Sequence, residues 1–220
     1  MNFILKKIIV CFCSINFLFP FAKAMHTCCS SDVLLSTTTQ KHTGTQIIET
    51  ERLILRKFTV DDAQKVYENW ASDPTNVATL TWNAHSDISF TKKLISSWVN
   101  DYSNATNYRW CITMKNENIP IGGIDVTNII NESTCEIGFV LSKSFWNKGI
   151  MTEATRAVIN YLFTHTNFNT ITAYHNIDNP ASGKVLTKSG MSQTEIISKG
   201  ARKNTGELVD KVIYKISKLK

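Results

Sequence analysis

The sequence lacks the spacing patterns by which proteins commonly bind metals and nucleotides. It has six cysteines, but no Cys-x-x-Cys pair and no matching histidine spacing, so it predicts no zinc site. Neither the phosphate-binding pattern GxxxxGK(S/T) nor the dinucleotide pattern GxGxxG is present. There is no internal repeat that would indicate a solenoid. The sequence therefore argues against these classes of protein and predicts a site without a metal.

Clustered basic residues are also missing. Lys and Arg number 24 against 18 Asp and Glu, a formal net charge of +6. Residues 1–46 carry four lysines and one aspartate, so the rest of the chain holds only half of that excess. Nucleic-acid binding needs Lys and Arg gathered on one surface to displace counterions. No nucleic-acid partner is predicted.

Residues 1–24 resemble an export signal. Lys6 and Lys7 precede an apolar stretch over 8–19, and Ala22-Lys-Ala24 is a small-x-small cleavage pattern. The apolar run is too short to span a membrane. Residues 25–46 are rich in Ser and Thr and unpatterned, which predicts a disordered linker. Either the head directs export, or it is a weak tether or a mis-assigned extension and the domain works in the cytoplasm. A cytoplasmic location is favoured, because the function predicted below needs a cofactor that is found in the cytosol.

Residues 47–218 predict one α+β domain around a single, mostly antiparallel sheet. Strands and helices mix without strict alternation, which is typical of that class. Gly122-Gly123 inside a strand predicts a bulge or a close backbone approach. The predicted strands cover 47–58, 107–114, 119–128, 135–141, 168–175, 191–198 and 208–217. The predicted helices cover 59–70, a segment from about 87, 149–164 and 180–188.

The segment from Glu136 to Glu153 predicts an anion site. An apolar strand ends at Leu141, a polar loop follows, and a helix starts at about Gly149. The free N–H groups of a helix start and the helix dipole attract anions. Gly149 leaves room for a phosphate, Lys148 adds positive charge and Thr152 can donate a hydrogen bond. Taken alone, the segment could also be an ordinary helix start with a turn glycine.

Four ordered motifs resemble those of the GNAT acetyltransferases, specifically the branch that acetylates ribosomal-protein N-termini. They are TERLILR at 50–56, EIGF at 136–139, WNKGIMTEA at 146–154 and NPAS at 179–182. The resemblance covers about 47–218. It implies the GNAT fold, in which a sheet of six to seven strands, flanked by helices, splays open in its middle. Acyl-CoA would lie in that wedge.

The resemblance also implies a donor site for acetyl-CoA. The pantetheine would pair with the strand around 139–141, and the pyrophosphate would bind the amides of 148–152. Met151 departs from the family, which has a small residue there, but binding by backbone groups tolerates the change. The implied donor-binding residues are Phe139, Val140, Leu141, Lys148, Gly149, Ile150, Met151, Thr152, Asn179 and Ser182.

Acyl transfer to an amine needs a proton acceptor and a donor to the leaving thiolate. Many family members use a tyrosine as the donor, but Leu186 stands at that position. Ser182 is the candidate donor, with helix capping as its alternative role. Glu136 is the candidate base, acting through water, and a solvated strand-end carboxylate is its alternative. His175 is a second possible base, whereas Glu153 fits better as an acid that stabilises a helix dipole.

The predicted function is an N-acetyltransferase that moves an acetyl group directly from acetyl-CoA to a primary amine. The acceptor is a protein N-terminus or a small amine, chosen by the region 70–105, and the enzyme is a monomer or a homodimer. One alternative is a non-catalytic acyl-CoA-binding or sensing module, because Leu186 replaces the tyrosine and Ala201 replaces a carboxylate of a related branch. The other is an exported binding protein, motivated by residues 1–24.

Overall fold

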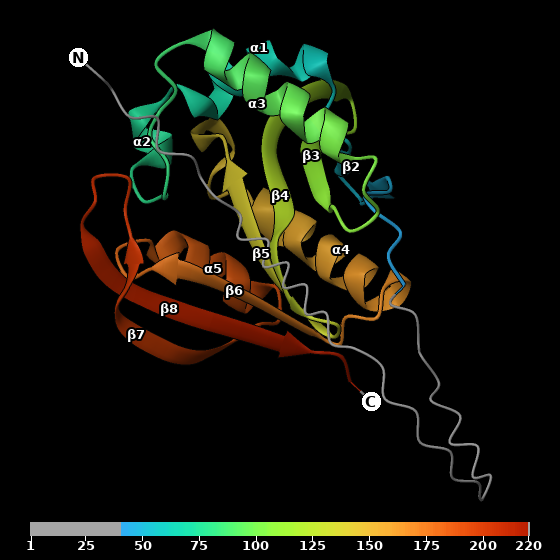
Figure 1. Ribbon diagram of the computed structural model, residues 1–220, viewed down its shortest axis with the longest axis vertical. Coiled ribbons are helices and arrows are strands. Elements are labelled where there is room, and N and C mark those ends of the chain that lie inside the picture. The colour runs from blue at the N-terminus through green and yellow to red at the C-terminus, as the bar shows by residue number, and fades with distance from the viewer. Residues whose placement is uncertain (1–40, 220) are drawn as a thin grey trace, which may run out of the picture. The chain divides into compact units, whose positions relative to one another are not determined.

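The computed structural model describes residues 41–219, which form a mixed sheet of eight strands with helices packed on its faces (Figure 1). The strands run in the spatial order β1-β2-β3-β4-β5-β6-β8-β7. They are β1 (Ile48–Glu49), β2 (Leu53–Arg56), β3 (Arg109–Met114), β4 (Glu117–Asn131), β5 (Thr134–Leu141), β6 (Thr170–Asn176), β7 (Ser192–Arg202) and β8 (Leu208–Ser217). The helices are α1 (Ala63–Val66), α2 (Pro74–Val77), α3 (Ile88–Asp101), α4 (Ile150–His165) and α5 (Pro180–Lys188).

The sheet parts between β5 and β6, as predicted. These two strands are the parallel pair of the described sheet, and they pair over three residues only, from Thr134↔Thr170 to Glu136↔Thr172. Beyond Glu136, β5 keeps its pairing with β4 while β6 continues against β8. Figure 1 shows the two strands diverging from this point. The backbone of β5 from 137 to 141 therefore has no strand partner on its β6 side.

The prediction of one strand over 47–58 is wrong, because the chain turns back within it. β1 and β2 pair antiparallel across a turn at 50–52. The Thr50 N–H donates to the Leu53 carbonyl at 3.0 Å, and the Thr50 hydroxyl accepts from the Leu53 N–H at 3.0 Å. A side chain that substitutes for a backbone partner is a common way to close a turn. The additional short strand brings the sheet to eight strands instead of six or seven.

The predicted helix over 59–70 is irregular. A 3-10 turn at Val60–Asp62 leads into α1, and a π turn follows at Tyr67–Ala71. Ser72 donates both its N–H and its hydroxyl to the Tyr67 carbonyl, five residues back, which fixes the π turn. The sequence did not predict α2, which begins at Pro74 with Asp73 as its N-cap.

The core lies in two clusters on opposite faces of the sheet. The larger one joins the sheet to α4 and α5, and its fully buried side chains include Trp110 and Leu162. The smaller one lies under α1 and α3 and includes Phe58 and Ile95. Gly122 lies on β4, where a Cβ would be 2.5 Å from the Val140 carbonyl oxygen of β5, so the predicted close backbone approach is present.

The end of the expected linker packs against the domain. Thr45 is buried, the Gly44 N–H donates to the Ala105 carbonyl, and the Tyr161 hydroxyl donates to the Gly44 carbonyl. Residues 1–24 and the first part of the linker lie outside the described residues, so the export signal and the domain limits stay predictions. Within 41–219, no helix is long and apolar enough to cross a membrane.

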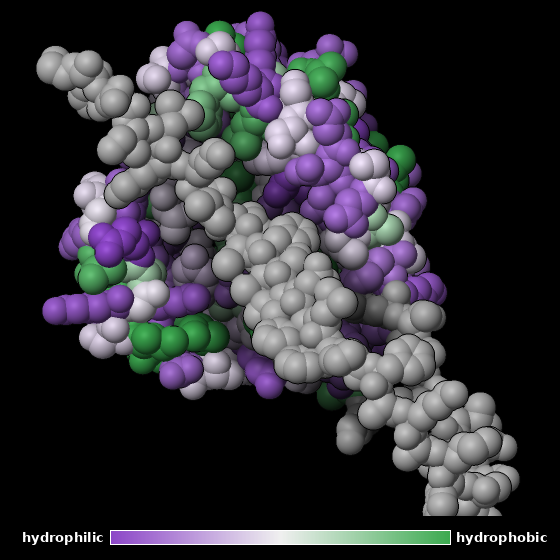
Figure 2. Space-filling view, in the orientation of Figure 1, coloured by the Kyte–Doolittle hydropathy of each residue, from purple (hydrophilic) through white to green (hydrophobic). Residues whose placement is uncertain are grey.

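Polar side chains cover much of the described surface in the view of Figure 2, with apolar side chains along the edge formed by the last two strands. The exposed large apolar residues of these strands are Ile196, Ile197 and Leu208.

A buried ion pair holds the first helical segment to the sheet and provides a test of the fold. Arg56 on β2 binds both oxygens of Asp62 at 2.8 Å, and the Asp62 side chain is only 6% exposed. We expect Asp62→Ala to lower the free energy of unfolding by about 3 kcal/mol, because it leaves the guanidinium without its partner. Urea unfolding measures this. Asp61→Ala, at the exposed neighbour, should change it by less than about 0.5 kcal/mol; equal effects would contradict the assignment.

Candidate active site

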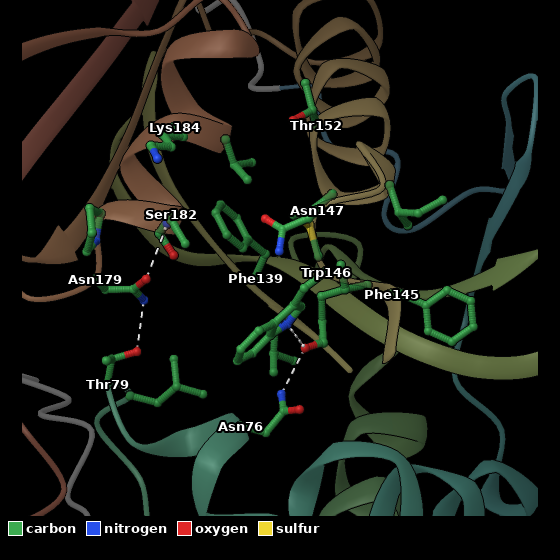
Figure 3. A pocket seen from close by; sticks show the side chains of 18 of the residues that line it. Asn76, Thr79, Phe139, Phe145, Trp146, Asn147, Thr152, Asn179, Ser182 and Lys184 are labelled. Atoms are coloured by element: carbon green, nitrogen blue, oxygen red, sulfur yellow. Dashed lines mark hydrogen bonds between the residues drawn. The ribbon is translucent and has the colours of Figure 1, made fainter. Parts of the chain in front are cut away.

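Two adjoining cavities lie where the sheet parts. The first, here the loop cavity, has a volume of about 620 Å³ and lies between α2, the end of β5, the loop at 145–149 and the first turns of α4 and α5 (Figure 3). The second, here the aromatic cavity, has a volume of about 590 Å³ and lies over β4 and β5, under α3 and the segment 79–85. The two share the residues Thr79, Leu80, Phe139, Val140, Asn179 and Ser182.

The start of α4 supplies unpaired backbone donors to the loop cavity. Asn147 and Gly149 both have positive φ, at 59° and 72°, so the chain turns sharply into the helix. Gly149 is the N-cap and has no side chain to cap the helix, so the first N–H groups remain free. Ile150, Met151 and Thr152 line the cavity at this point. Free N–H groups and a helix dipole form a site for an anion.

Two side chains fix the loop before α4 by donating hydrogen bonds to the same backbone carbonyl at the end of β5. The Trp146 indole and the Asn76 amide each donate to the Leu141 carbonyl at 2.8 Å. Asn76 also accepts from the Lys143 N–H at 2.9 Å. Figure 3 shows Trp146 and Asn76 converging on this oxygen at the edge of the cavity. The end of β5 and the loop are thereby fixed to α2, which the sequence did not predict.

Nine of the ten predicted donor-binding residues line the loop cavity; Lys148 does not. Its ammonium donates to the Ser144 carbonyl at 2.8 Å and lies 5.4 Å from the centre of the Phe145 ring. The side chain of Met151 is buried in the core, so its backbone remains the part that can bind a ligand. The roles of all these residues stay predictions.

Glu153 holds the first turn of α4 to the turn between β1 and β2. Its carboxylate accepts from the Thr50 hydroxyl at 2.5 Å, from the Arg52 N–H at 3.0 Å and from Arg52 Nε at 2.6 Å. Arg52 also donates to the Lys148 carbonyl at 3.0 Å. Burial opposes ionisation of Glu153, but the hydrogen bonds from Thr50 and Arg52 outweigh it and lower the pKa. The predicted first-turn acid is also a tertiary anchor.

Ser182 faces both cavities with a hydroxyl that bonds to no residue among 41–219. Asn179 is the N-cap of α5 and accepts from the Ser182 N–H at 3.3 Å, so the capping role belongs to Asn179. The Asn179 amide donates to the Thr79 hydroxyl at 2.9 Å, which Figure 3 shows beside Ser182. Leu186 is fully buried in the core. No tyrosine acid can act from that position.

The segment Val77–Leu80, here the strap, crosses between the two halves of the parted sheet. Its Thr79 carbonyl accepts from the Asn176 amide at 2.7 Å, and its Leu80 carbonyl accepts from the Asn204 N–H at 3.1 Å. Asn176 ends β6, and Asn204 lies in the turn between β7 and β8. The strap therefore borders both cavities and ties α2 to the far half of the sheet.

Glu136 lies at the point where β5 and β6 separate, and it lines the aromatic cavity. Its carboxylate accepts from the Thr127 hydroxyl at 3.2 Å and lies 3.9 Å from the ammonium of Lys211. His175 also lines this cavity, but its Nδ1 is 2.7 Å from the Asn176 carbonyl. A Cβ on Gly183 would be 2.6 Å from His175 Nε2, so α5 packs directly against that nitrogen. Glu136 is the more accessible of the two predicted bases.

The aromatic cavity also contains a carboxylate that the sequence analysis did not single out. Asp125 on β4 pairs with Arg109 on β3, with Oδ2 3.2 Å from Arg109 Nη2, and the guanidinium lies 4.5 Å from the centre of the Trp98 ring. The side chain of Asp125 is 27% exposed, but the exposed part faces the cavity beneath the helices and not the outer surface. Because the carboxylate is thus largely removed from bulk water, its pKa is raised, and Arg109 offsets only part of this rise. A charged residue inside the apolar run 121–126 was the available signal.

The choice of acceptor was predicted to lie in the region 70–105. Four residues of this region, Trp70, Trp82, His85 and Trp98, line the aromatic cavity. His85 Nδ1 is 2.7 Å from the Thr91 hydroxyl, and burial lowers the pKa of this histidine.

Residues 52–192 match the model of the acetyltransferase (GNAT) domain. The chain belongs to the GNAT acetyltransferase family. It is 32% identical to an uncharacterised N-acetyltransferase, p20, from Bacillus licheniformis, over 80% of this chain and 97% of the relative. As a member of this family it is an acyltransferase with acetyl-CoA as its donor, as predicted.

Solved structures agree with this assignment of the fold. A GNAT-family acetyltransferase from Bacillus anthracis is 27% identical and aligns with a TM-score of 0.68, over 78% of this chain and 98% of that one. RimL, a ribosomal L7/L12 α-N-protein acetyltransferase solved with coenzyme A, is 18% identical with a TM-score of 0.70, over 79% and 98% of the two chains. The predicted likeness to ribosomal-protein acetyltransferases is thus present in the fold. No group of metal-ligating side chains occurs within 41–219.

Gly149 provides the test of the anion site. We expect Gly149→Glu to weaken acetyl-CoA binding at least about tenfold, because a carboxylate would occupy the start of α4 and repel phosphate. Calorimetric titration with acetyl-CoA measures this. Gly206→Glu is the matched control, since Gly206 has φ of +88° and no atom within 4 Å of an added Cβ. It carries the same backbone strain and should bind acetyl-CoA normally. Equal affinities of the two variants would contradict the site.

Glu153 should make stability depend on pH. We expect Glu153→Gln to lower the free energy of unfolding at pH 7 by about 2 kcal/mol, because it loses charge-assisted hydrogen bonds. The pKa of Glu153 is lowered by folding, so its contribution is complete above the ordinary value of 4.5 and disappears as the pH falls through the folded value. Urea unfolding at several pH values should therefore show the wild type and the variant converging in acid. A constant difference would contradict the anchor.

Proposed function

We propose that this acetyltransferase transfers the acetyl group directly to a primary amine while donor and acceptor are bound together. Acetyl-CoA occupies the loop cavity, and the amine enters from the aromatic cavity. What supports the proposal is the junction of the two cavities at Val140, Asn179 and Ser182. Two substrates that react directly need adjoining sites whose reacting atoms meet.

The donor would be held mainly by backbone groups. The pyrophosphate binds the free N–H groups of 149–152 at the start of α4, and the side chain of Thr152 adds a donor. The pantetheine arm lies along the β5 edge at 139–141, where the parting from β6 leaves peptide groups without a strand partner. Asn179 and Ser182 close the other side of the arm. The thioester is thereby directed to the junction of the cavities.

The chemistry then needs two proton movements. The ammonium of the acceptor loses a proton through water to Glu136, and the neutral nitrogen attacks the thioester carbon. The carbon–sulfur bond breaks, and the acetyl group remains on nitrogen as an amide. The Ser182 hydroxyl donates a hydrogen bond to the departing thiolate, which finally takes the proton that the nitrogen releases. Ser182 suits this role because Asn179 already caps α5 and leaves the hydroxyl free.

Ser182→Ala tests the thiolate donor. We expect kcat to fall by roughly 10- to 100-fold, since one hydrogen bond to the leaving group is lost, while the KM for acetyl-CoA changes little. Thiol release with an amine panel measures both. Thr187→Ala is the control, because this exposed hydroxyl on the same helix donates to the Gly183 carbonyl at 3.0 Å. An unchanged kcat would reject Ser182. Acetyl-CoA binding without thiol release on any amine would instead support the non-catalytic alternative.

A further inference from the structure

One carboxylate oxygen in the aromatic cavity has no partner among the described residues. Arg109 makes both of its contacts with Asp125 through Oδ2, at 3.2 and 3.3 Å. Oδ1 accepts no hydrogen bond from any residue of 41–219. Asp125 lies between Arg109 on β3 and Gly138 on β5. A Cβ on Gly138 would be 3.8 Å from Oδ1, so the free oxygen lies on the side of β5 and of the parting in the sheet.

Two glycines form part of the floor of the cavity around this oxygen. Gly138 stands directly opposite Asp125, and Gly123 lies two residues before Asp125 on β4. A Cβ on Gly123 would lie 3.3 Å from the Phe58 ring, and one on Gly138 would lie 2.8 Å from the Thr127 methyl, so glycine lets these two side chains lie close to the sheet. Asp125 itself lines the cavity and is 27% exposed, so its carboxylate is reachable from there.

The wall facing the sheet is aromatic. The Phe58 and Trp98 ring centres lie 5.2 Å apart, Trp82 and His85 lie 5.4 Å apart, and His85 and Phe90 lie 4.6 Å apart. A cation near such rings is attracted to their faces, and apolar or aromatic groups pack well among them. A free carboxylate oxygen below an aromatic wall is a suitable site for an ammonium that carries an apolar body.

The charge of the cavity matches one cation. Its acidic residues are Asp125 and Glu136, and Glu136 is already engaged by Thr127 and Lys211. The Arg109 guanidinium on the β3 side bonds to Oδ2 and lies over the Trp98 ring. A second or third ammonium, as in a polyamine or an aminoglycoside, would find no open carboxylate and would be buried at a cost.

We propose that the acceptor is a small monoamine with an apolar, aromatic body, bound through its ammonium to Oδ1 of Asp125. The body packs between the floor at Gly123 and Gly138 and the rings of Trp82 and Trp98. This inference rests on the proposed function, because it assigns a substrate class to the cavity from which the amine enters. It also separates a binding carboxylate, Asp125, from the proton acceptor, Glu136.

An acceptor panel tests the substrate class. Phenethylamine, spermidine, kanamycin and a short peptide that begins with alanine are compared by thiol release from acetyl-CoA. We expect phenethylamine to have a kcat/KM at least about tenfold above each of the others. A higher kcat/KM with spermidine, kanamycin or the peptide would overturn the inference and leave the acetyl transfer itself intact. Acetyl-CoA that binds but releases no thiol with any amine would contradict the proposed function.

Variants at the free oxygen test the binding residue. We expect Asp125→Asn to raise the KM for phenethylamine at least about tenfold, because the charge-assisted hydrogen bond is lost, with the KM for acetyl-CoA unchanged. Asp61→Asn, at an exposed carboxylate on the 3-10 turn, is the matched control. Gly138→Ala keeps every charge and adds a methyl group 3.8 Å from Oδ1 and 2.8 Å from the Thr127 methyl, which has to shift. We expect it to raise the same KM, and circular dichroism checks that the variant is folded. A normal KM in both site variants would overturn the assignment.

A binding measurement makes the test independent of turnover. Phenethylamine and phenethyl alcohol share one body and differ in the ammonium, and each is titrated into the protein with coenzyme A present. We expect the wild type to bind the amine at least about tenfold more tightly, and Asp125→Asn to bind the two equally. A variant that kept the preference for the amine would show that Asp125 does not hold the ammonium. This result stands whether or not the panel shows turnover.

Discussion

The separation of β5 from β6 after Glu136 is the constraint on which both cavities depend. A parallel pair normally continues its hydrogen bonds along the strands, but here the pairing ends after three residues. The open stretch of β5 leaves peptide groups available to a ligand, and it also makes room for the adjoining loop cavity and aromatic cavity. Unpaired backbone inside a fold is costly unless something satisfies it. A pantetheine arm with its own amides is suited to do so.

An open sheet needs other contacts to hold its halves together. The strap at Val77–Leu80 supplies them on one side, because the amides of Asn176 at the end of β6, Asn179 at the start of α5 and Asn204 in the β7–β8 turn all bond to it. On the other side Glu153 holds the start of α4 to the β1–β2 turn. The helix N-terminus is thus fixed from a distant part of the chain, so its free N–H groups keep one direction. Preorganised donors of this kind bind an anion without having to be reordered.

The sequence predicted the parts of this site that depend on local pattern. The start of α4 at about Gly149 and the helix over 180–188 follow from residues next to one another in the chain, and both are present. The chain reversal at Thr50 was not predicted; its local Thr50–Leu53 hydrogen bonds are supported by Glu153, about a hundred residues away, which accepts from the Thr50 hydroxyl. Lys148 was expected at the phosphate from its position alone, yet its flexible side chain finds the Ser144 carbonyl. The sequence marked Asp125 only as a charge inside an apolar run, because its place beside Arg109 and near Trp98 depends on the fold.

The Asp125–Arg109 pair is hard to explain as a device for stability. A buried ion pair contributes little once the cost of removing both charges from water is counted, and apolar residues often replace it without loss. Here Arg109 bonds to one carboxylate oxygen only, and the side chain of Asp125, which is 27% exposed, lines the aromatic cavity. The free oxygen of Asp125 can instead accept a hydrogen bond from the ammonium of a substrate whose body packs against the aromatic rings. This ammonium would then lie next to the junction of the cavities, where the thioester is proposed to lie.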